Sequence, residues 1–414
     1  MTSSFQLSHG VGSAAGIDPL SRGSVEQVPC RVAFVSETWQ PEINGVTHTL
    51  GQLVAQLGAR GYPMQLVRPR PEDGGRDPAM EAELQVKALP VLDYDGVQMG
   101  ITSPRRLRDH WRTHRPDVIY IATEGPLGLI ALRVARRLGI PVVSGFHTNF
   151  DHYSQHYILL RIVRPFVRTF LKRFHNRTQI TLVPTSAQAE RMTKAGYRNV
   201  KVMGRGLDPA RFSPRFRDLA LRKTWGAGDD DCVALHVGRL AVEKNVTLLI
   251  EALEAMRAAN PDQIAVIVGD GPLRKEAERR LPWVHFAGFL RDQALARHYA
   301  SADLFLFPSL SETFGNVVTE AMASGLATLA FDYAAAGELI ERGREGVTVA
   351  CNNPAGFVAA ATELAADTER VRAQGRAASA RVSSLGWERI AETFIGHLHQ
   401  AQEVGDARKD LSAV

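Results

Sequence analysis

The chain has 414 residues, which is enough for two or three domains, because single hydrophobic cores seldom grow past about 250–300 residues. Hydrophobic residues make up 45% of it, as in an ordinary globular protein. The formal net charge of +5 and the sequence pI near 9.2 favour an anionic partner such as a nucleotide, a phosphate or an anionic membrane. The positive charge is spread along the chain without a nucleic-acid-binding motif, so we expect no nucleic-acid partner.

Cys30, Cys232 and Cys351 lie too far apart for a zinc motif, and their odd number and wide spacing fit a reducing compartment rather than a disulfide framework. Residues 1–28 are rich in serine and glycine and lack the apolar core of a signal peptide, so we expect a flexible tail. No uninterrupted apolar stretch reaches the roughly 18 residues of a transmembrane helix. We therefore expect a protein that is soluble or lies on a surface.

Short β-branched runs alternate with helical patterns from Arg31 onward. In the first half of the chain the predicted buried strands are 31–36, 64–68, 117–122, 141–147, 180–184 and 200–203. Helices between them, such as 46–60 and 126–138, end in a glycine followed by a proline, as expected where a helix turns back into a strand. This alternation predicts a parallel sheet covered on both faces.

The first predicted strand leads through a loop into a helix, in the stretch FVSETWQPEINGVTHTL (34–50). Asn44 and Gly45 open that helix, and glycine would let a phosphate or a sugar approach the backbone closely. Asn-Gly pairs also mark ordinary turns, so the pattern is weak by itself.

His147 ends the strand 141–147, where a side chain would face a cleft. With His152 and His156 it could suggest a metal cluster, but no H-E-x-x-H motif or cysteine partner accompanies them. The acidic stretches LDYDG (92–96) and GDDD (228–231) have the composition of turns. We therefore expect no metal.

Residues 157–177 form a predicted basic amphipathic helix with aromatic residues, and Pro165 would kink it. Such a helix can dock on anionic lipid, each cation adding about 1 kcal/mol near the surface. The alternative is an ordinary helix whose apolar stripe faces its own sheet. The candidate membrane-facing residues are Arg161, Arg164, Phe166, Arg168, Phe170, Lys172 and Arg173.

The strand–helix alternation starts again after a connecting segment, residues 204–231. The second series of predicted strands is 232–238, 264–271, 283–288, 303–308, 326–331 and 346–350. Two such series indicate two doubly wound domains. Because ligands bind such sheets at the carboxyl ends of strands, a cleft between the domains is the expected site.

The stretch HVGRLAVEKN (236–245) follows the first strand of the second series and places two cations at its carboxyl end. Arg239 as a bidentate fork and Lys244 as a point charge could neutralise a departing diphosphate without a metal. The alternative is that both are ordinary surface cations.

The stretch PSLSETFGNVVTEAMASG (308–325) joins strand 303–308 to a predicted helix 316–324. Gly315 and the amides of residues 316–318 would form a helix N-terminus that attracts anions. Glu312 and Glu320 are placed to accept hydrogen bonds from sugar or ribose hydroxyls. The alternative is that Glu312 is a loop residue and Glu320 a solvated helix position.

Taken in order, these stretches resemble the group 1 (family 4) retaining glycosyltransferases. FVSETWQPEINGV, FHTNF, GRGLDPARFSP, VGRLAVEKN, GDGP and SETFGNVVTEAMASG all occur in sequence over residues 30–400. The resemblance implies the α/β GT-B fold, with two Rossmann-like domains facing a central cleft. It implies a flexible tail over 1–28, an acceptor-side domain over 29–204, a nucleotide-sugar domain over 205–385, and a final helix, 386–403, that crosses back to the first domain.

The resemblance also implies roles for individual residues. Arg239 and Lys244 would bind the donor diphosphate, Glu312 the transferred sugar and Glu320 the ribose, with His147 beside the sugar. Asp208 would cap the turn of the connecting segment. The other positions implied to bind the donor are Gly45, Gly269, Gly271, Phe314, Gly315, Asn316 and Val317. One departure concerns the loop DYAAAGELI (332–340), where many members have a Gly-Gly-x-x-Glu pattern and only Glu338 is retained.

We expect a retaining glycosyltransferase that moves a hexose from a nucleotide sugar, best matched by GDP-mannose, to a hydroxyl of a lipid-linked or glycolipid acceptor, without a cofactor. A glycolipid synthase that uses UDP-glucose, UDP-glucuronate or UDP-sulfoquinovose is the alternative, followed by a nucleotide-sugar epimerase. A dinucleotide-dependent oxidoreductase lacks its G-x-G-x-x-G signature. The expected location is cytoplasmic, attached peripherally to the inner face of an anionic membrane.

Overall fold

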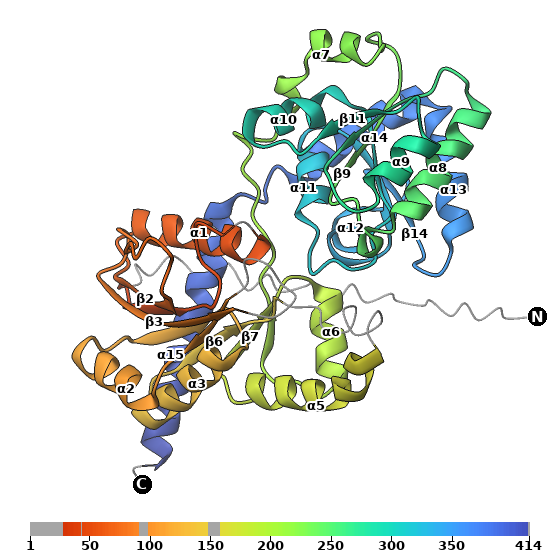
Figure 1. Ribbon diagram of the computed structural model, residues 1–414. Coiled ribbons are helices and arrows are strands. Elements are labelled where there is room, and N and C mark those ends of the chain that lie inside the picture. The colour runs from red at the N-terminus through yellow and green to blue at the C-terminus, as the bar shows by residue number, and fades with distance from the viewer. Residues whose placement is uncertain (1–27, 43, 91–97, 148–157, 413–414) are drawn as a thin grey trace, which may run out of the picture.

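The computed structural model describes residues 28–42, 44–90, 98–147 and 158–412, except for the side chains of 158–164 and 408–412. Figure 1 shows two bodies joined by extended chain, each with a sheet and its own helices. None of the helices in these residues has the length and apolarity that crossing a bilayer requires.

The N-terminal sheet has eight strands in the order β4-β3-β2-β1-β5-β6-β7-β8, all parallel to their neighbours except β4, which runs antiparallel to β3. Its strands are β1 (Val32–Val35), β2 (Met64–Pro69), β3 (Ala82–Pro90), β4 (Gln98–Ile101), β5 (Val118–Ile121), β6 (Val142–Gly145), β7 (Ile180–Val183) and β8 (Val200–Val202). Its helices are α1 (Gly45–Ala59), α2 (Pro104–Thr113), α3 (Pro126–Leu138), α5 (Ile158–His175) and α6 (Ser186–Lys194).

The C-terminal sheet has six parallel strands in the order β11-β10-β9-β12-β13-β14. Its strands are β9 (Val233–Val237), β10 (Ile264–Val268), β11 (His285–Gly288), β12 (Leu304–Phe307), β13 (Ala327–Phe331) and β14 (Gly346–Val349). Its helices are η1 (Pro214–Phe216), α7 (Leu219–Thr224), η2 (Val242–Lys244), α8 (Val246–Ala259), α9 (Arg274–Arg280), α10 (Asp292–Ser301), α11 (Asn316–Ala323), α12 (Ala334–Leu339), α13 (Pro354–Ala365) and α14 (Thr368–Val382).

The strands predicted from the sequence are all present in the structure, with their ends moved by a few residues. Sequence analysis did not predict β3 and β4, which have partly exposed residues along their length and so lack the apolar run of a buried strand. The loop predicted around residues 92–96 lies outside the described residues. The strands on either side of it, β3 and β4, pair antiparallel, as a hairpin-like connection requires.

The last helix, α15 (Trp387–Ser412), packs against the N-terminal sheet although it follows the C-terminal domain in the chain. Its Phe394 is fully buried and meets the ring of Tyr120 edge-on, with 4.9 Å between the ring centroids. The two chain crossings between the domains run side by side, because Leu207 N donates to Leu385 O at 2.7 Å. The N-terminal core is thus completed by a helix from the other end of the chain.

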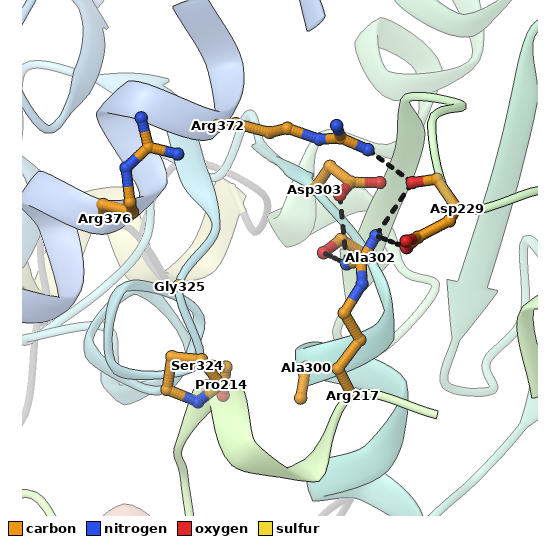
Figure 2. Close-up of a pocket in the computed structure, with 10 residues that line it drawn as sticks. All are labelled: Pro214, Arg217, Asp229, Ala300, Ala302, Asp303, Ser324, Gly325, Arg372 and Arg376. Carbon is orange, nitrogen blue, oxygen red and sulfur yellow. Dashed lines mark hydrogen bonds and ion pairs between the residues drawn. The ribbon is translucent and has the colours of Figure 1, made fainter. Parts of the chain in front are cut away.

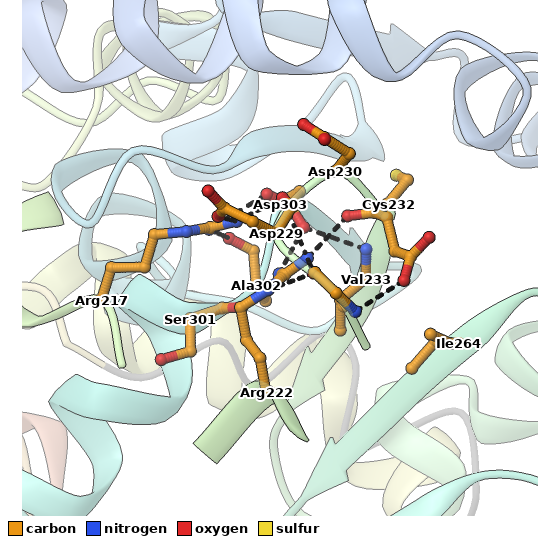
Figure 3. A network of polar contacts seen from close by, with 12 residues as sticks. Arg217, Arg222, Asp229, Asp230, Cys232, Val233, Ile264, Ser301, Ala302 and Asp303 are labelled. Carbon is orange, nitrogen blue, oxygen red and sulfur yellow. Dashed lines mark hydrogen bonds and ion pairs between the residues drawn. The ribbon is translucent and has the colours of Figure 1, made fainter. Parts of the chain in front are cut away.

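A buried arginine ties the segment between the domains to the C-terminal sheet. The side chain of Arg222 is 0% exposed and its Nη1 lies 2.8 Å from Asp303 Oδ2. The same guanidinium donates to the carbonyl oxygens of Gly228 and Asp231. It also donates to that of Ser301, which Figure 3 shows beside Arg222. Every polar edge of this buried cation is therefore used, which is the condition for burying a charge without a large loss of stability.

We predict that Asp303→Asn lowers the free energy of unfolding of the C-terminal domain by about 3 kcal/mol, because it leaves the buried Arg222 without its counter-charge. Urea denaturation followed by circular dichroism measures this change. Asp230→Asn is the matched control, since Asp230 is 98% exposed and its pair with Arg372 is open to water, and it should shift stability by less than about 0.5 kcal/mol. Equal effects of the two substitutions would contradict the structural role of Asp303.

Candidate active site

The loops that follow β9 and β10 pack so closely that two glycines are required between them. A Cβ on Gly269, whose φ is +139°, would lie 1.9 Å from Gly238 O, and one on Gly271 would lie 2.4 Å from Leu240 O. Leu240 N donates to Asp270 O at 2.9 Å across the same contact. Close packing of the two loops at the carboxyl end of the sheet therefore explains why glycine is needed at positions 269 and 271. Their predicted role in donor binding stays a prediction.

Lys244 and Glu312 form an ion pair between the loops after β9 and β12, which are neighbouring strands. The two side chains are only 22% and 15% exposed, so water screens the pair incompletely. Ser309 Oγ donates to the same carboxylate oxygen at 2.7 Å, and the ammonium lies 5.9 Å from the ring centroid of Phe307. Both predicted residues are therefore held in place at the carboxyl edge rather than left as mobile surface charges.

Arg239 lies on the same loop as Lys244 but is much more exposed. Its side chain is 68% exposed, and its nearest acidic partner is Glu243, at 3.7 Å between Nη1 and Oε1. A pair this exposed contributes little to stability. Arg239 is therefore free to reorient toward an anion at this edge.

The helix α11 begins at Asn316, as the sequence predicts, directly after Gly315 in the left-handed conformation at φ +91°. Val318 N donates to Gly315 O at 3.0 Å, whereas in the described residues the amides of Asn316 and Val317 have no hydrogen-bond acceptor. The anion-attracting N-terminus therefore offers two free amides, and the third amide that we predicted is used within the helix. The side chain of Phe314 is buried in the core beneath this turn.

Glu320 lies one turn into α11 and is partly buried. Burial raises the pKa of its carboxyl, while a hydrogen bond from the Tyr299 hydroxyl, 3.0 Å away, and the charge of Arg211 act in the opposite direction. The alternative of a fully solvated helix position is therefore wrong. The carboxylate keeps acceptor capacity for a hydroxyl of a bound ligand.

His147 lies at the end of β6 and is buried, with both ring nitrogens engaged. Its Nδ1 is 2.6 Å from Arg205 Nη2, and its Nε2 is 2.8 Å from the Tyr120 hydroxyl. An arginine can only donate, so Nδ1 accepts and Nε2 carries the hydrogen. Burial and the charge of Arg205 lower the pKa of His147 well below its usual value, which keeps the ring neutral.

The main chain of His147 meets the donor-side loop of the other domain. Its carbonyl oxygen accepts a hydrogen bond from Thr313 Oγ1 at 3.1 Å. A second contact between the domains joins Glu338 to the start of α6, where its carboxylate accepts from Ser186 N at 3.1 Å and Ser186 Oγ at 2.6 Å. The predicted cleft residues of the two sheets are thus brought to a common boundary.

On the N-terminal side, a Cβ at Gly45 would meet no atom within 4 Å. The fold itself therefore does not require glycine there. Asn44 caps α1, its Oδ1 accepting from Val46 N and Thr47 N at 3.0 and 2.9 Å. The helix start that was predicted to face a phosphate is therefore capped by Asn44 and has open space at Gly45.

Two further residues at this boundary were missed by the sequence analysis. Arg205 lies in the quoted GRGLDPARF stretch, but nothing in its spacing indicated that it would be buried against His147. Glu37 lies in the SETWQPEIN loop, where its Oε1 accepts from Leu127 N at 3.0 Å and burial raises its pKa to about 7. Its position directly after the first predicted strand, at the carboxyl end where ligands bind, could have identified Glu37 as a candidate site residue.

His152 and His156 lie outside the described residues, so the histidine cluster weighed from the sequence has only His147 within them. The described residues contain no group of three potential metal ligands. That no metal or cofactor is needed stays a prediction, as do the roles of the individual site residues.

Comparison with known proteins identifies the class. Residues 43–211 match the family model described as Glycosyltransferase Family 4, and residues 231–367 match that described as Glycosyl transferases group 1. A GDP-mannose-dependent alpha-mannosyltransferase from Corynebacterium glutamicum is 31% identical, over 89% of this chain and 88% of that protein. The chain therefore belongs to the group 1, family 4 glycosyltransferases, and it is a hexosyltransferase.

Two further relatives bear on its fold and its substrate. The sulfoquinovosyl transferase SQD2 of Arabidopsis thaliana is 30% identical over 75% of this chain and 61% of that protein. The crystal structure of Anabaena HepE in complex with UDP and glucose superimposes with a TM-score of 0.68 at 20% identity, covering 90% of this chain and all of that one (100%). The structural match confirms the predicted GT-B fold.

The loop that departs from the family pattern carries backbone strain. Ala334, at the position of the first glycine of the Gly-Gly-x-x-Glu pattern, has a left-handed φ of +52°. We predict that Ala334→Gly raises the free energy of unfolding by about 0.5–1 kcal/mol, because glycine adopts this conformation without a Cβ clash. Thermal denaturation measures the shift.

Ala336→Gly in the same helix is the control for this prediction. Ala336 is buried at 2% exposure and is not among the residues with positive φ. Its replacement should destabilise the protein by about 1 kcal/mol through lost helix propensity and packing. A destabilising effect of Ala334→Gly as well would show that the strain at residue 334 is not significant.

Proposed function

We propose that the protein transfers a mannosyl group from GDP-mannose to a hydroxyl of a glycolipid acceptor, with retention of configuration. The observation that carries this proposal is the gathering of Arg239, the Lys244–Glu312 pair and the free amides of α11 at one sheet edge. The name of the relative from Corynebacterium glutamicum supports GDP-mannose as the donor. The name of the relative from Arabidopsis thaliana supports the alternative, a sulfoquinovosyl donor.

The chemistry of the proposed step follows from where charge develops. Breaking the bond between the sugar and the diphosphate leaves negative charge on the departing diphosphate. Lys244, Arg239 and the amides of Asn316 and Val317 would stabilise this charge through dipoles and charges already in place. In our proposal these protein groups act without a metal, and a diphosphate oxygen takes the proton of the acceptor hydroxyl on the face from which it departs.

In the structure Glu312 pairs with Lys244. Binding of the donor would exchange this partner for the diphosphate and leave the carboxylate for hydroxyls of the sugar. The open space in front of Gly45 supports an approach of the donor from the N-terminal side as well.

We predict that Lys244→Met lowers kcat/KM for mannosyl transfer by about 10²–10³-fold, the loss typical of removing one preorganised donor to a developing anion. Release of GDP and formation of mannosylated lipid, each followed with GDP-mannose and a lipid acceptor, measure the effect. Lys275→Met is the matched control, since Lys275 is an exposed lysine on α9 of the same domain. Unchanged transfer by the Lys244 variant would count against the proposal, and transfer only from UDP-sugars would favour the alternative donor.

A pocket of about 390 Å³ beside the site supports a neutral, hydroxyl-rich acceptor headgroup. It lies at the carboxyl ends of β1 and β2, and the residues that line it are Glu37, Trp39, Gln40, Pro41, Glu42, Arg68, Pro69, Pro71, Glu72, Asp73 and Gln98. Arg68 is already paired, its Nε lying 2.7 Å from Glu83 Oε1. The remaining charged groups of the wall are carboxylates, which attract hydroxyls and repel phosphate.

The half of α5 whose side chains are described supports attachment to a membrane. Leu171 and Phe174 are buried at 5% and 1% exposure, whereas Phe166 and Phe170, on the preceding turns of the helix, are 74% and 37% exposed. The side chains of Arg161 and Arg164 lie outside the described residues. We propose that the exposed aromatic face, together with basic residues of the helix such as Arg173, docks on anionic lipid at the cytoplasmic face. The three free cysteines support this reducing compartment.

We predict that the double variant Phe166→Ser/Phe170→Ser binds vesicles containing anionic phospholipid at least tenfold more weakly at low salt, because it removes the apolar part of the docking face. Co-sedimentation with the vesicles measures binding. Phe289→Ser, which alters an exposed phenylalanine (63%) of the other domain, is the control. Equal retention of both variants, or no retention of the unaltered protein, would contradict membrane docking through α5.

A further inference from the structure

The C-terminal domain contains a second polar pocket on the edge of the sheet opposite the donor residues. Its volume is about 230 Å³, and Figure 2 shows the residues that line it. Among them Asp303 directly precedes β12, and Gly325 lies just before β13. The donor residues follow the carboxyl ends of these parallel strands, so the pocket lies at the amino ends, away from the transfer site.

Three arginines surround this pocket. Arg372 and Arg376 lie one turn apart on α14, and Arg217 follows η1. Within the described residues Arg376 has no hydrogen bond or ion pair. Arg372 pairs with the carboxylate of Asp230 at 3.2 Å, but Asp230 is 98% exposed, so this pair contributes little. Its Nη2 also donates to the main-chain oxygen of Asp229 (Figure 2).

A buried hydroxyl in the wall also lacks a partner. Ser324 ends α11 and is 3% exposed, and its Oγ has no hydrogen bond in the described structure. Leaving a buried polar group unpaired costs about 1–3 kcal/mol, so such an atom calls for an explanation. A ligand oxygen in the pocket would provide the missing acceptor.

The two acidic residues of the wall do not cancel the positive charge. The carboxylate of Asp303 is occupied by Arg217 at 3.1 Å, by Arg222 at 2.8 Å and by the amide of Val233 at 3.0 Å (Figure 3). The side chain of Asp229 is 69% exposed and lies 3.7 Å from Arg217 Nη2. The guanidinium of Arg376 therefore remains available to an anion, and that of Arg372 keeps the N–H groups that Asp230 and the main-chain oxygen of Asp229 do not use.

We propose that this pocket binds the phosphate group of a small phosphate monoester, with Arg372 and Arg376 pairing with its oxygens and Ser324 Oγ donating to it. Guanidinium groups match phosphate geometry by forming paired hydrogen bonds. The volume is below the roughly 300–1,000 Å³ of pockets that hold drug-sized ligands, which favours a small phosphate ester over a nucleotide sugar.

The position of the pocket connects it to the donor site through one helix. Ser324 lies at the carboxyl end of α11, and Asn316, whose amide is free for a diphosphate, lies at its other end. α14 packs tightly on this element, because a Cβ on Gly375 would lie 2.0 Å from Gly325 O, and Ser379 Oγ donates to Ala323 O at 3.2 Å. A ligand held between α14 and Ser324 would therefore contact the helix that also carries the donor residues.

The test is titration of the full-length protein with glycerol 3-phosphate by isothermal calorimetry, in the presence of saturating GDP so that the donor site is filled. We expect one saturable site whose affinity falls as salt rises. Inorganic phosphate in a parallel titration separates a site for the ester from a site for the bare ion, and weaker binding of inorganic phosphate is expected. Tighter binding of inorganic phosphate than of the ester would overturn the assignment to a monoester.

Variants locate the binding. Arg372→Gln/Arg376→Gln should weaken the affinity at least tenfold, whereas Arg381→Gln, the same kind of substitution at an exposed position of the same helix, should leave it unchanged. Ser324→Ala removes the unpaired hydroxyl, so it should keep or raise the thermal midpoint and still weaken binding. The absence of saturable binding, or equal binding by the double variant and the control, would overturn the proposal. GDP binding is measured separately, so this outcome is independent of the proposed transfer reaction.

Discussion

The ion pair between Lys244 and Glu312 is the interaction on which the proposed transfer site depends. It joins two loops that follow neighbouring strands of one sheet, and it is shielded enough for its charges to interact strongly. The ammonium of Lys244 is suited to a diphosphate and the carboxylate of Glu312 to hydroxyls. A nucleotide sugar contains a diphosphate and hydroxyls, so it can replace the contact between the two side chains with one contact to each of them.

The sheet topology explains why this pair forms where it does. Strands β9 and β12 are adjacent although they are far apart in the chain, and all strands of the sheet are parallel, so the loops after them meet at one edge. The opposite edge of the same sheet collects the loops that precede the strands, with Asp303, Arg222 and the pocket beside α14. One domain thus has two edges that can attract anions, and different residues line each of them. Helix α11 extends from one edge to the other.

Much of this arrangement could be predicted from the sequence, because apolar runs separated by helical patterns define parallel strands and place the following motifs at one edge. Lys244, Glu312 and the start of α11 were found in this way. The orientation of His147 could not be predicted, since its partners Tyr120 and Arg205 come from distant segments and only the folded sheet brings them together. The buried role of Arg222 was missed for the same reason, as its acceptors are mainly main-chain carbonyl oxygens, which no side-chain pattern reveals. Strand β3, which lies between β2 and the edge strand β4, lacked the apolar run that identified the others.

The central claim is that Lys244 and the amides of Asn316 and Val317 hold the diphosphate of the donor. A crystal structure of the protein with GDP-mannose bound tests it most directly. The account predicts a phosphate oxygen within hydrogen-bond distance of Lys244 Nζ and of at least one of these two amides, with Glu312 released from the lysine and turned to the sugar. A diphosphate bound elsewhere, with the Lys244–Glu312 pair intact, would contradict it.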